Sequence, residues 1–468
     1  MWHPEDYQIA ATLFIRLLGL IYFFAFFPFI YQIKGLIGSE GILPVQRFLD
    51  GIYFRYRREA YYYLPSLFWF NSSDHMLLFV PILGSVLSLF LLCGIYPFVL
   101  IPILMVLYLS IISVGQDFLS FGWEMFLMEI SFNAFFLSWT DVPNLYVWIS
   151  INLLLARFHF QAGAVKIQSQ DPSWRNLQAV GHHYQSQPIP NTIAWYVYKL
   201  PIWFHKVSTL MMFIIELVFP LFVFDGEVLR FTAFLGFFGL QFIIWLTGNF
   251  SYLNHMTAVL SIILLPNSYL NPFFAFSNGQ GEPSLFISSI LSIIGVTLVA
   301  LQLMRLWTHF FPSNLFKDIL RLLSPFHLIN RYGIFAVMTI KRYEIIIEGS
   351  EDGQNWKEYL FRYKPSDCQR RPRRISPFQP RLDWQAWFLP FSGYHYEIWF
   401  QNFLHRILEG SPSVLSLVRF NPFPEVPPRY IRAKIYDYTY TTSEDKKKTG
   451  NWWNREFIGY YSPVLTKK

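Results

Sequence analysis

The chain has 468 residues, of which 53% are hydrophobic and 14% are charged, with a formal net charge of +7. Because an ordinary soluble protein carries about 25% charged residues, this composition excludes a soluble globular domain and indicates a protein that crosses a membrane several times. The basic residues form no compact nucleic-acid-binding motif, so we expect no nucleic acid partner. Cys93 and Cys368 are the two cysteines, and so small a number argues against a disulfide framework.

Apolar segments recur along the first 305 residues, and we expect each to form a helix that approaches the roughly 20 residues needed to cross hydrocarbon. They lie at 11–32, 76–93, 97–114, 118–139, 146–162, 207–224, 231–245, 256–265 and 285–303. Segment 256–265 is short for a span, so the predicted count is eight or nine. No cleavage site precedes the first segment, which predicts a retained span and not a signal peptide. Tight connections at 94–97 and 140–143 predict antiparallel neighbours.

The chain changes character after about residue 305. Between 338 and 364, apolar and polar residues alternate about an Asp-Gly turn, which predicts a β-hairpin. Residues 397–410 have helical spacing and end in Gly, and residues 427–441 alternate again. These patterns predict a separate β-rich domain outside the membrane over residues 330–468, with the architecture of a β-sandwich.

The predicted fold is a polytopic α-helical membrane protein of 8–9 spans over residues 1–305, with large loops at 34–74 and 166–206, followed by the extramembrane β-rich domain. Nine spans place both loops and the tail on one side of the membrane. That side is rich in basic residues, and the positive-inside rule makes it cytoplasmic. The basic residues of the two loops are Lys34, Arg47, Arg55, Arg57, Arg58, Lys166, Arg175, Lys199 and Lys206.

Ionisable residues within apolar segments are costly to bury, so they are candidates for a functional site. They are Arg16, Glu124, Glu129, Arg157, His159 and Glu216. One interpretation is a structural ion pair between Arg157 and one of the two glutamates of the preceding segment. The other is a polar cavity that faces the 166–206 loop. Glu216 lies in the middle of an apolar run and needs a donor, which Lys166 can supply across the bundle.

The 166–206 loop opens with a dense polar sequence. Asp171 and Pro172 predict the start of a helix, because Asp caps a helix N-terminus and Pro fits the first helical position. His182 and His183 are adjacent, so their side chains point apart, and no further ligand has metal-binding spacing. We therefore expect no metal site.

A run of arginines lies in the tail, at Arg370, Arg371, Arg373 and Arg374. One interpretation is a solvated charged loop. The alternative is a docking surface for an acidic partner or for the anionic headgroups of membrane lipids, with Trp384 and Trp387 as nearby aromatic anchors.

Several long segments of the sequence resemble the lipase maturation factor family. Among them are "SFGWEMFLMEISFNAFFLSW", "LTGNFSYLNHMT", "IIIEGSEDGQNWKEYLFRYKP" and "NPFPEVPPRYIRAKIYDYTYT". The resemblance runs in order from about residue 10 to 440 and covers both the bundle and the tail. It implies a membrane protein that helps secreted homodimeric lipases, such as lipoprotein and hepatic lipase, to fold and assemble. No G-x-S-x-G motif or other catalytic triad pattern appears, which agrees with a chaperone-like factor and not a hydrolase.

The same resemblance implies a location. It places the protein in the endoplasmic reticulum membrane if eukaryotic, or in the inner membrane if bacterial, with the tail in the lumen or periplasm. This disagrees with the positive-inside rule. We expect the lumenal or periplasmic location that the family resemblance implies, because an assembly factor must meet a secreted client there. The expected partners are a secreted lipase-like client and membrane lipids, and no cofactor is expected.

On this hypothesis the loop and the tail form one amphiphilic surface that transiently covers the client's exposed apolar surface. Proline residues on either side stiffen the loop, so less entropy is lost on binding. The client-binding candidates are Trp174, Arg175, His182, His183, Tyr184, Trp195, Trp203, Arg373, Arg374, Trp384 and Trp387.

A second, local resemblance concerns "AGAVKIQSQDPSW" at 162–174, which is similar to the stretch of vitamin K-dependent γ-carboxylases that carries their lysine base. It implies an alternative function, an integral-membrane enzyme in which Lys166 acts as the base on a lipid or quinol-like substrate. Glu124, Glu129, Arg157, His159 and Glu216 would then line its cavity. Lysines at span ends also extend to the interface without catalysis. A third option is a lipid-binding scaffold.

Overall fold

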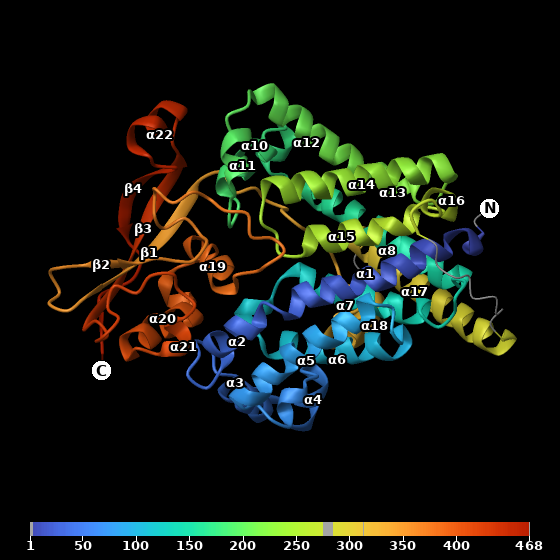
Figure 1. Ribbon diagram of the computed structural model, residues 1–468, viewed down its shortest axis with the longest axis horizontal. Coiled ribbons are helices and arrows are strands. Elements are labelled where there is room, and N and C mark those ends of the chain that lie inside the picture. The colour runs from blue at the N-terminus through green and yellow to red at the C-terminus, as the bar shows by residue number, and fades with distance from the viewer. Residues whose placement is uncertain (1–2, 275–283, 312, 468) are drawn as a thin grey trace.

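The computed structural model describes residues 3–274, 284–311 and 313–467. A bundle of helices makes up most of the molecule, and the C-terminal sheet with its helices lies at the end of the bundle opposite the N-terminus (Figure 1). In the described part of the chain, six helices are long and apolar enough to cross a membrane. They are α1 (Gln8–Phe26) with the helical turn before it, α5 (Asp74–Leu92), α6 (Pro97–Val114), α12 (Ile202–Leu217) continued by α13 (Phe219–Phe222), α14 (Glu227–Thr247) and α17 (Leu285–Phe310).

The other three predicted spans form α7 (Gly122–Leu137), α8 (Leu145–Gln168) and α15 (Leu253–Ser261). All three lie inside the bundle: α7 packs on α6 and α8, α8 also packs on α12 and α17, and α15 packs on α1 and α14. α7 and α15 are shorter than the six spans, and α8 carries several polar residues, so none of the three is both long and apolar enough to count as a span on those two properties alone. The structure therefore supports a membrane domain with six apolar spans and does not confirm the count of eight or nine.

Both large loops contain short helices. The first contains the end of α2 (Phe29–Ile37), α3 (Val45–Tyr56) and α4 (Ala60–Tyr63), and the second contains α9 (Pro172–Arg175), α10 (Ala179–Ser186) and α11 (Thr192–Val197). The predicted cap at Asp171 is confirmed, because its Oδ1 accepts a hydrogen bond of 2.8 Å from Ser173 N. Its Oδ2 accepts from Met338 N at 2.6 Å, which fastens the loop to the segment that leads into the tail.

The tail follows α18 (Asn314–Leu323) and contains one antiparallel sheet. Its strands are β1 (Arg342–Ser350), β2 (Lys357–Tyr359), β3 (Tyr430–Tyr440), β4 (Trp453–Tyr460) and β5 (Leu465–Thr466). They run in the order β2-β1-β3-β4, with β5 also paired to β3. The predicted hairpin is confirmed as β1–β2, with Gly353 in its turn at φ +76°.

The described part of the tail also contains four α-helices. They are α19 (Arg381–Ala386), α20 (Ile398–Glu409), α21 (Pro412–Leu415) and α22 (Ser443–Thr449). The predicted helix at 397–410 is confirmed as α20, and it packs on β3. In the described residues α20 thus packs on part of the sheet while β4 stays largely exposed, and the β-sandwich is not confirmed.

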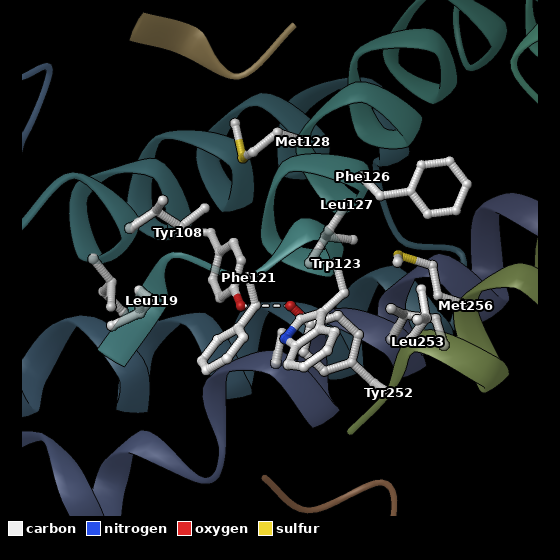
Figure 2. Close-up of a cluster of buried hydrophobic side chains, with 14 of the residues drawn as sticks. Tyr108, Leu119, Phe121, Trp123, Phe126, Leu127, Met128, Tyr252, Leu253 and Met256 are labelled. Atoms are coloured by element: carbon white, nitrogen blue, oxygen red, sulfur yellow. Dashed lines mark hydrogen bonds between the residues drawn. The ribbon is translucent and has the colours of Figure 1, made fainter. Parts of the chain in front are cut away.

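The largest apolar cluster of the described residues runs from the bundle into the tail. Figure 2 shows part of it, where Trp123 lies among Tyr108, Phe121 and Tyr252. The ring of Trp384 from the tail lies edge-on to Trp123, with centroids 5.0 Å apart. The tail is therefore packed into the bundle and not tethered to it by a linker alone.

Close helix packing generates the first prediction. A Cβ placed on Gly295 of α17 would lie 2.6 Å from the backbone of Tyr146 and Val147 at the start of α8. We expect Gly295→Val to lower the free energy of unfolding by about 1–3 kcal/mol, because the two helices must separate. Thermal unfolding in detergent measures this. Gly239→Val on α14 is the matched control, since nothing lies within 4 Å of a Cβ there. Equal losses in the two variants would contradict the prediction.

Candidate functional site

A cavity of about 590 Å³ lies at the tail-facing end of the bundle, between α8, α12, α14 and α15. The 166–206 loop covers it with Trp174 and Tyr184, and the segment leading to the tail contributes Phe335 and Met338. Most of the lining is apolar, with methionine, phenylalanine, isoleucine and leucine side chains predominating. Its volume is in the range of about 300–1,000 Å³ typical of small-molecule sites.

A buried ion pair lies in the wall of this cavity. Lys166 Nζ contacts both carboxylate oxygens of Glu216, at 2.6 and 2.7 Å, so the predicted contact between them is confirmed. Gly163 makes it possible, because a Cβ there would lie 3.0 Å from Glu216 Cβ and would push α12 away from α8. Lys166 Nζ also lies 5.5 Å from the centre of the Trp174 ring.

His183 lies beside the ion pair and is packed among aromatic rings. Its ring stacks on Phe250 with centroids 5.6 Å apart and meets Phe335 edge-on at 5.1 Å. Burial, together with the positive charge of Lys166, lowers the pKa of His183 to about 4. The ring is therefore neutral at physiological pH, and the ion pair is the charged group of the cavity wall.

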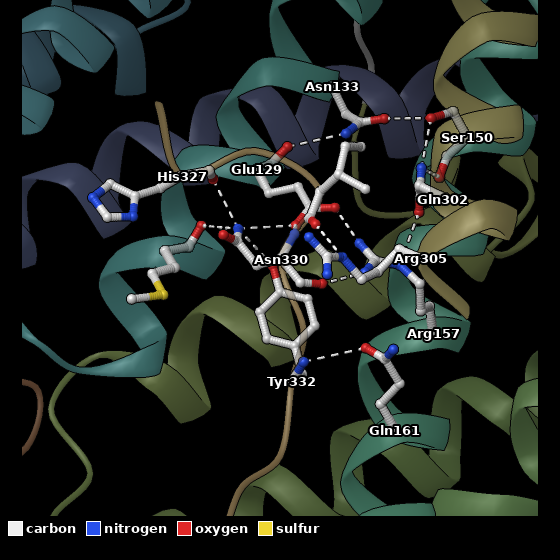
Figure 3. Close-up of polar contacts among 12 residues, drawn as sticks. Glu129, Asn133, Ser150, Arg157, Gln161, Gln302, Arg305, His327, Asn330 and Tyr332 are labelled. Atoms are coloured by element: carbon white, nitrogen blue, oxygen red, sulfur yellow. Dashed lines mark hydrogen bonds and ion pairs between the residues drawn. The ribbon is translucent and has the colours of Figure 1, made fainter. Parts of the chain in front are cut away.

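The predicted pairing of Arg157 is confirmed, and its partner is Glu129. Arg157 Nη2 donates to Glu129 Oε1, and Arg157 Nη1 donates to Asn330 O at 2.5 Å. Glu129 Oε2 accepts from Tyr332 Oη at 2.7 Å. Figure 3 shows these groups converging from α7, α8 and the segment before the tail, with Gln302 of α17 beside Arg157. The charged groups of this cluster are satisfied by one another, which agrees with the structural interpretation of Arg157.

Glu124 and His159 are held in separate places. Glu124 accepts from Arg381 Nη1 of the tail at 2.7 Å and from Tyr252 Oη at 2.7 Å, and Tyr108 also donates to it. His159 stacks on Phe237 with centroids 3.9 Å apart, while its Nδ1 donates to Leu155 O. The cavity thus brings together Lys166, Glu216 and His159, whereas Glu124, Glu129 and Arg157 lie in the two other clusters.

The client-binding candidates divide by exposure. Trp174, Tyr184, Trp195 and Trp384 are buried, because the tail closes over the loop: Trp387 Nε1 donates to Ser186 O at 2.9 Å, and Arg342 Nη1 donates to Gln185 O at 3.1 Å. Trp387, His182 and His183 are intermediate. The exposed candidates are Arg175, Trp203, Arg373 and Arg374. The aromatic surface expected on the loop is thus largely an internal interface.

Sequence patterns gave no sign of three residues that complete the buried clusters: Asn330, Tyr332 and Arg381. Each comes from a segment more than 170 residues from the carboxylate it contacts, so no local spacing could indicate it. Among the residues that the structure describes, no group of three His, Cys, Asp or Glu side chains is arranged to hold a metal ion.

The family comparison identifies both parts of the chain. The lipase maturation factor transmembrane domain matches residues 9–272, and the lipase maturation factor C-terminal domain matches residues 328–463. The chain belongs to the lipase maturation factor family. Residues 273–327 lie between the two matches, yet α17 in this stretch donates a hydrogen bond from Gln302 Nε2 to Ser150 O in the bundle core.

Curated relatives carry the same name. Lipase maturation factor 1 of Mus musculus is 31% identical over 99% of this chain and 88% of that protein, and the Homo sapiens protein is 31% identical over 99% and 89%. Lipase maturation factor 2 of Gallus gallus is 29% identical over 97% and 81%. No solved structure matches the chain. The resemblance in the sequence is therefore confirmed across the membrane domain and the tail of this lipase maturation factor family member.

The Glu124–Arg381 pair generates the second prediction. Arg381→Met leaves Glu124 buried without its cation, so we expect a loss of about 3–5 kcal/mol of unfolding free energy. The double variant Glu124→Gln with Arg381→Met removes both charges and should recover much of that loss. Thermal unfolding, with trypsin cleavage of the tail as a second readout, measures both.

Arg455→Met is the matched control for this pair. Arg455 Nη2 contacts Glu358 at 2.9 Å, but both side chains are about one-third exposed, so the loss should stay below about 1 kcal/mol. If Arg381→Met were no more harmful than Arg455→Met, the tail would not depend on the buried pair.

Proposed function

We propose that this chain assists the folding or assembly of a secreted lipase on the lumenal or periplasmic side of a membrane. The observation that carries the proposal is the similarity to named lipase maturation factors over 99% of the chain, through both domains. The relatives give no support to the γ-carboxylase alternative.

We further propose that the chain crosses the membrane nine times, with α7, α8 and α15 as spans in addition to the six apolar helices. The buried Glu129–Arg157 and Glu124–Arg381 pairs support this, because they remove the charge that otherwise bars α7 and α8 from hydrocarbon. With nine passes, both loops and the tail lie on one side. For a lipase client this side is the lumen of the endoplasmic reticulum in a eukaryote, or the periplasm in a bacterium.

The proposed client surface is the basic patch where the loop meets the tail, in which Lys199, Arg371 and Arg373 are exposed and Lys446 is half-buried. Lys199 Nζ lies 3.2 Å from Ser443 Oγ at the start of α22, and Arg371 Nε donates to Thr192 Oγ1 at 3.1 Å. Lys446 of α22 lies over the ring of Trp452, 3.4 Å from its centre. We name this patch, made of Lys199, Arg371, Arg373 and Lys446, the junction patch. Its charge fits an acidic segment of the client.

Trp203 has a different role in this proposal. It is 63% exposed at the start of α12 and follows Pro201. A tryptophan at the end of a span anchors the helix at the boundary between membrane and water. We therefore assign Trp203 to contact with membrane lipids and not to the client.

The third prediction tests the function in cells that lack their own lipase maturation factor and express a secreted homodimeric lipase. We expect the chain to raise the amount of active lipase per molecule synthesised, provided that it reaches the same membrane. If lipase is equally inactive with and without the correctly located chain, the proposed function is wrong.

The client surface is tested by charge reversal in the same cells. Arg371→Glu with Arg373→Glu should reduce active lipase severalfold, because the patch would repel an acidic segment. Arg55→Glu with Arg58→Glu is the matched control, since both arginines are exposed in the other large loop. Equal activity of the two double variants at equal protein level would show that the client binds elsewhere.

A further inference from the structure

The cavity beside Lys166 opens toward the hydrocarbon of the bilayer. Of its described lining residues, the exposed ones are Val207 and Met211 on α12 and Ile243 on α14, which are 51%, 47% and 54% exposed. Both helices are apolar enough to span a membrane. The opening therefore lies between two spans, where lipid and not water meets the protein.

The two helices that frame the opening meet at one end and separate toward the other. A Cβ on Gly236 of α14 would lie 3.6 Å from Ile215 of α12. Nearer the loop, the cavity lies between them, and the buried Trp174 and Tyr184 close it on the extramembrane side. A molecule from the bilayer can thus enter sideways, while access from water is covered.

The wall of the cavity carries no net charge. Lys166 and Glu216 are its Lys, Arg, Asp and Glu residues, and they neutralise one another. A charged lipid headgroup would find no further charged side chain here to balance its charge, and burying an unbalanced charge in an apolar cavity is unfavourable. The charge balance thus favours an uncharged occupant.

The ion pair is nevertheless suited to bind a hydroxyl group. A lysine ammonium has three donors, and two contacts here are directed at the oxygens of Glu216. A carboxylate can accept about four hydrogen bonds, so Glu216 retains acceptor capacity. A hydroxyl both donates and accepts, and it matches this pair without adding charge. Met211 and Met212 are flexible side chains that adapt to chains of variable shape.

We propose that this cavity binds one uncharged, hydroxyl-bearing glycerolipid of the diacylglycerol class, taken from the bilayer between α12 and α14. Its hydroxyl lies at the Lys166–Glu216 pair, and its acyl chains lie against the methionine and phenylalanine side chains and leave through the opening. Binding involves no chemical change of the lipid. The proposal does not rest on the proposed client function, so a chain that fails to mature a lipase should still retain its lipid.

The experiment is mass spectrometry of lipids that remain with the full chain after purification in a mild detergent, compared with the lipids of the membrane of origin. We expect about one diacylglycerol-class molecule per protein, a strong enrichment over the membrane. Ser208→Phe fills the cavity and should reduce the retained lipid by about tenfold, equivalent to 1.4 kcal/mol. Leu210→Phe is the matched control, because Leu210 is exposed on the same helix and does not line the cavity.

A charge variant tests the choice of headgroup even if Ser208→Phe fails to fold. Glu216→Gln leaves Lys166 as a lone cation, so the retained lipid should change to an anionic one such as a fatty acid. Lys166→Gln with Glu216→Gln restores neutrality and should restore the uncharged lipid. Thermal unfolding confirms that each variant is folded. Retention of bulk phospholipids, of a sterol or quinone, or of no lipid by the natural chain would overturn the proposal.

Discussion

The structure depends on the neutralisation of three carboxylates inside an apolar bundle. Glu124, Glu129 and Glu216 are buried, and each is paired with a cation. An uncompensated buried charge costs several kilocalories per mole, which is a large part of the stability of most proteins. Because Arg381 belongs to the tail, the bundle cannot bury Glu124 at low cost until the tail is in place. The two domains recognised by the family comparison therefore stabilise each other, and we expect them to unfold together.

Further polar contacts fasten the loop and the tail to each other and to the bundle. Asp171 of the loop accepts a hydrogen bond from Met338 before the tail, and Arg342 of β1 donates to Gln185 of the loop. Asn330 and Tyr332 fasten the intervening segment to Glu129. A rigid binding surface loses less entropy when a partner binds. If the client binds the junction patch, the buried tryptophans of the loop and the tail would contribute by fixing the shape of that patch, and not by direct contact.

The sequence predicted those features of the fold that depend on the local pattern of apolar and polar residues. Apolar runs located the helices, alternation located β1, β2 and β3, and the buried Arg157 and Glu216 each required a partner that neighbouring spans supply. It could not predict the Glu124–Arg381 pair, because no periodicity links residues 257 positions apart. Nor could it separate buried from exposed tryptophans, since aromatic side chains are favoured both in cores and at binding surfaces. The second sheet of the expected sandwich is not confirmed, because the helix α20 packs on β3, and the periodicity of residues 397–410 did not indicate on which element that helix would pack.

The cavity and the proposed client surface share the 166–206 loop. Ile193 and Val197 of α11 line the cavity, while Thr192 contacts Arg371 and Lys199 contacts α22 at the junction patch. A lipid that fills the cavity would add contacts to the inner side of α11 and so would stabilise the loop in this arrangement. Thermodynamic linkage then requires that a lipid which stabilises this loop arrangement also favours client binding at the junction patch, and that the client favours lipid binding in return. The physical consequence is that a client which binds the junction patch would tighten lipid retention by the same factor by which the lipid tightens client binding.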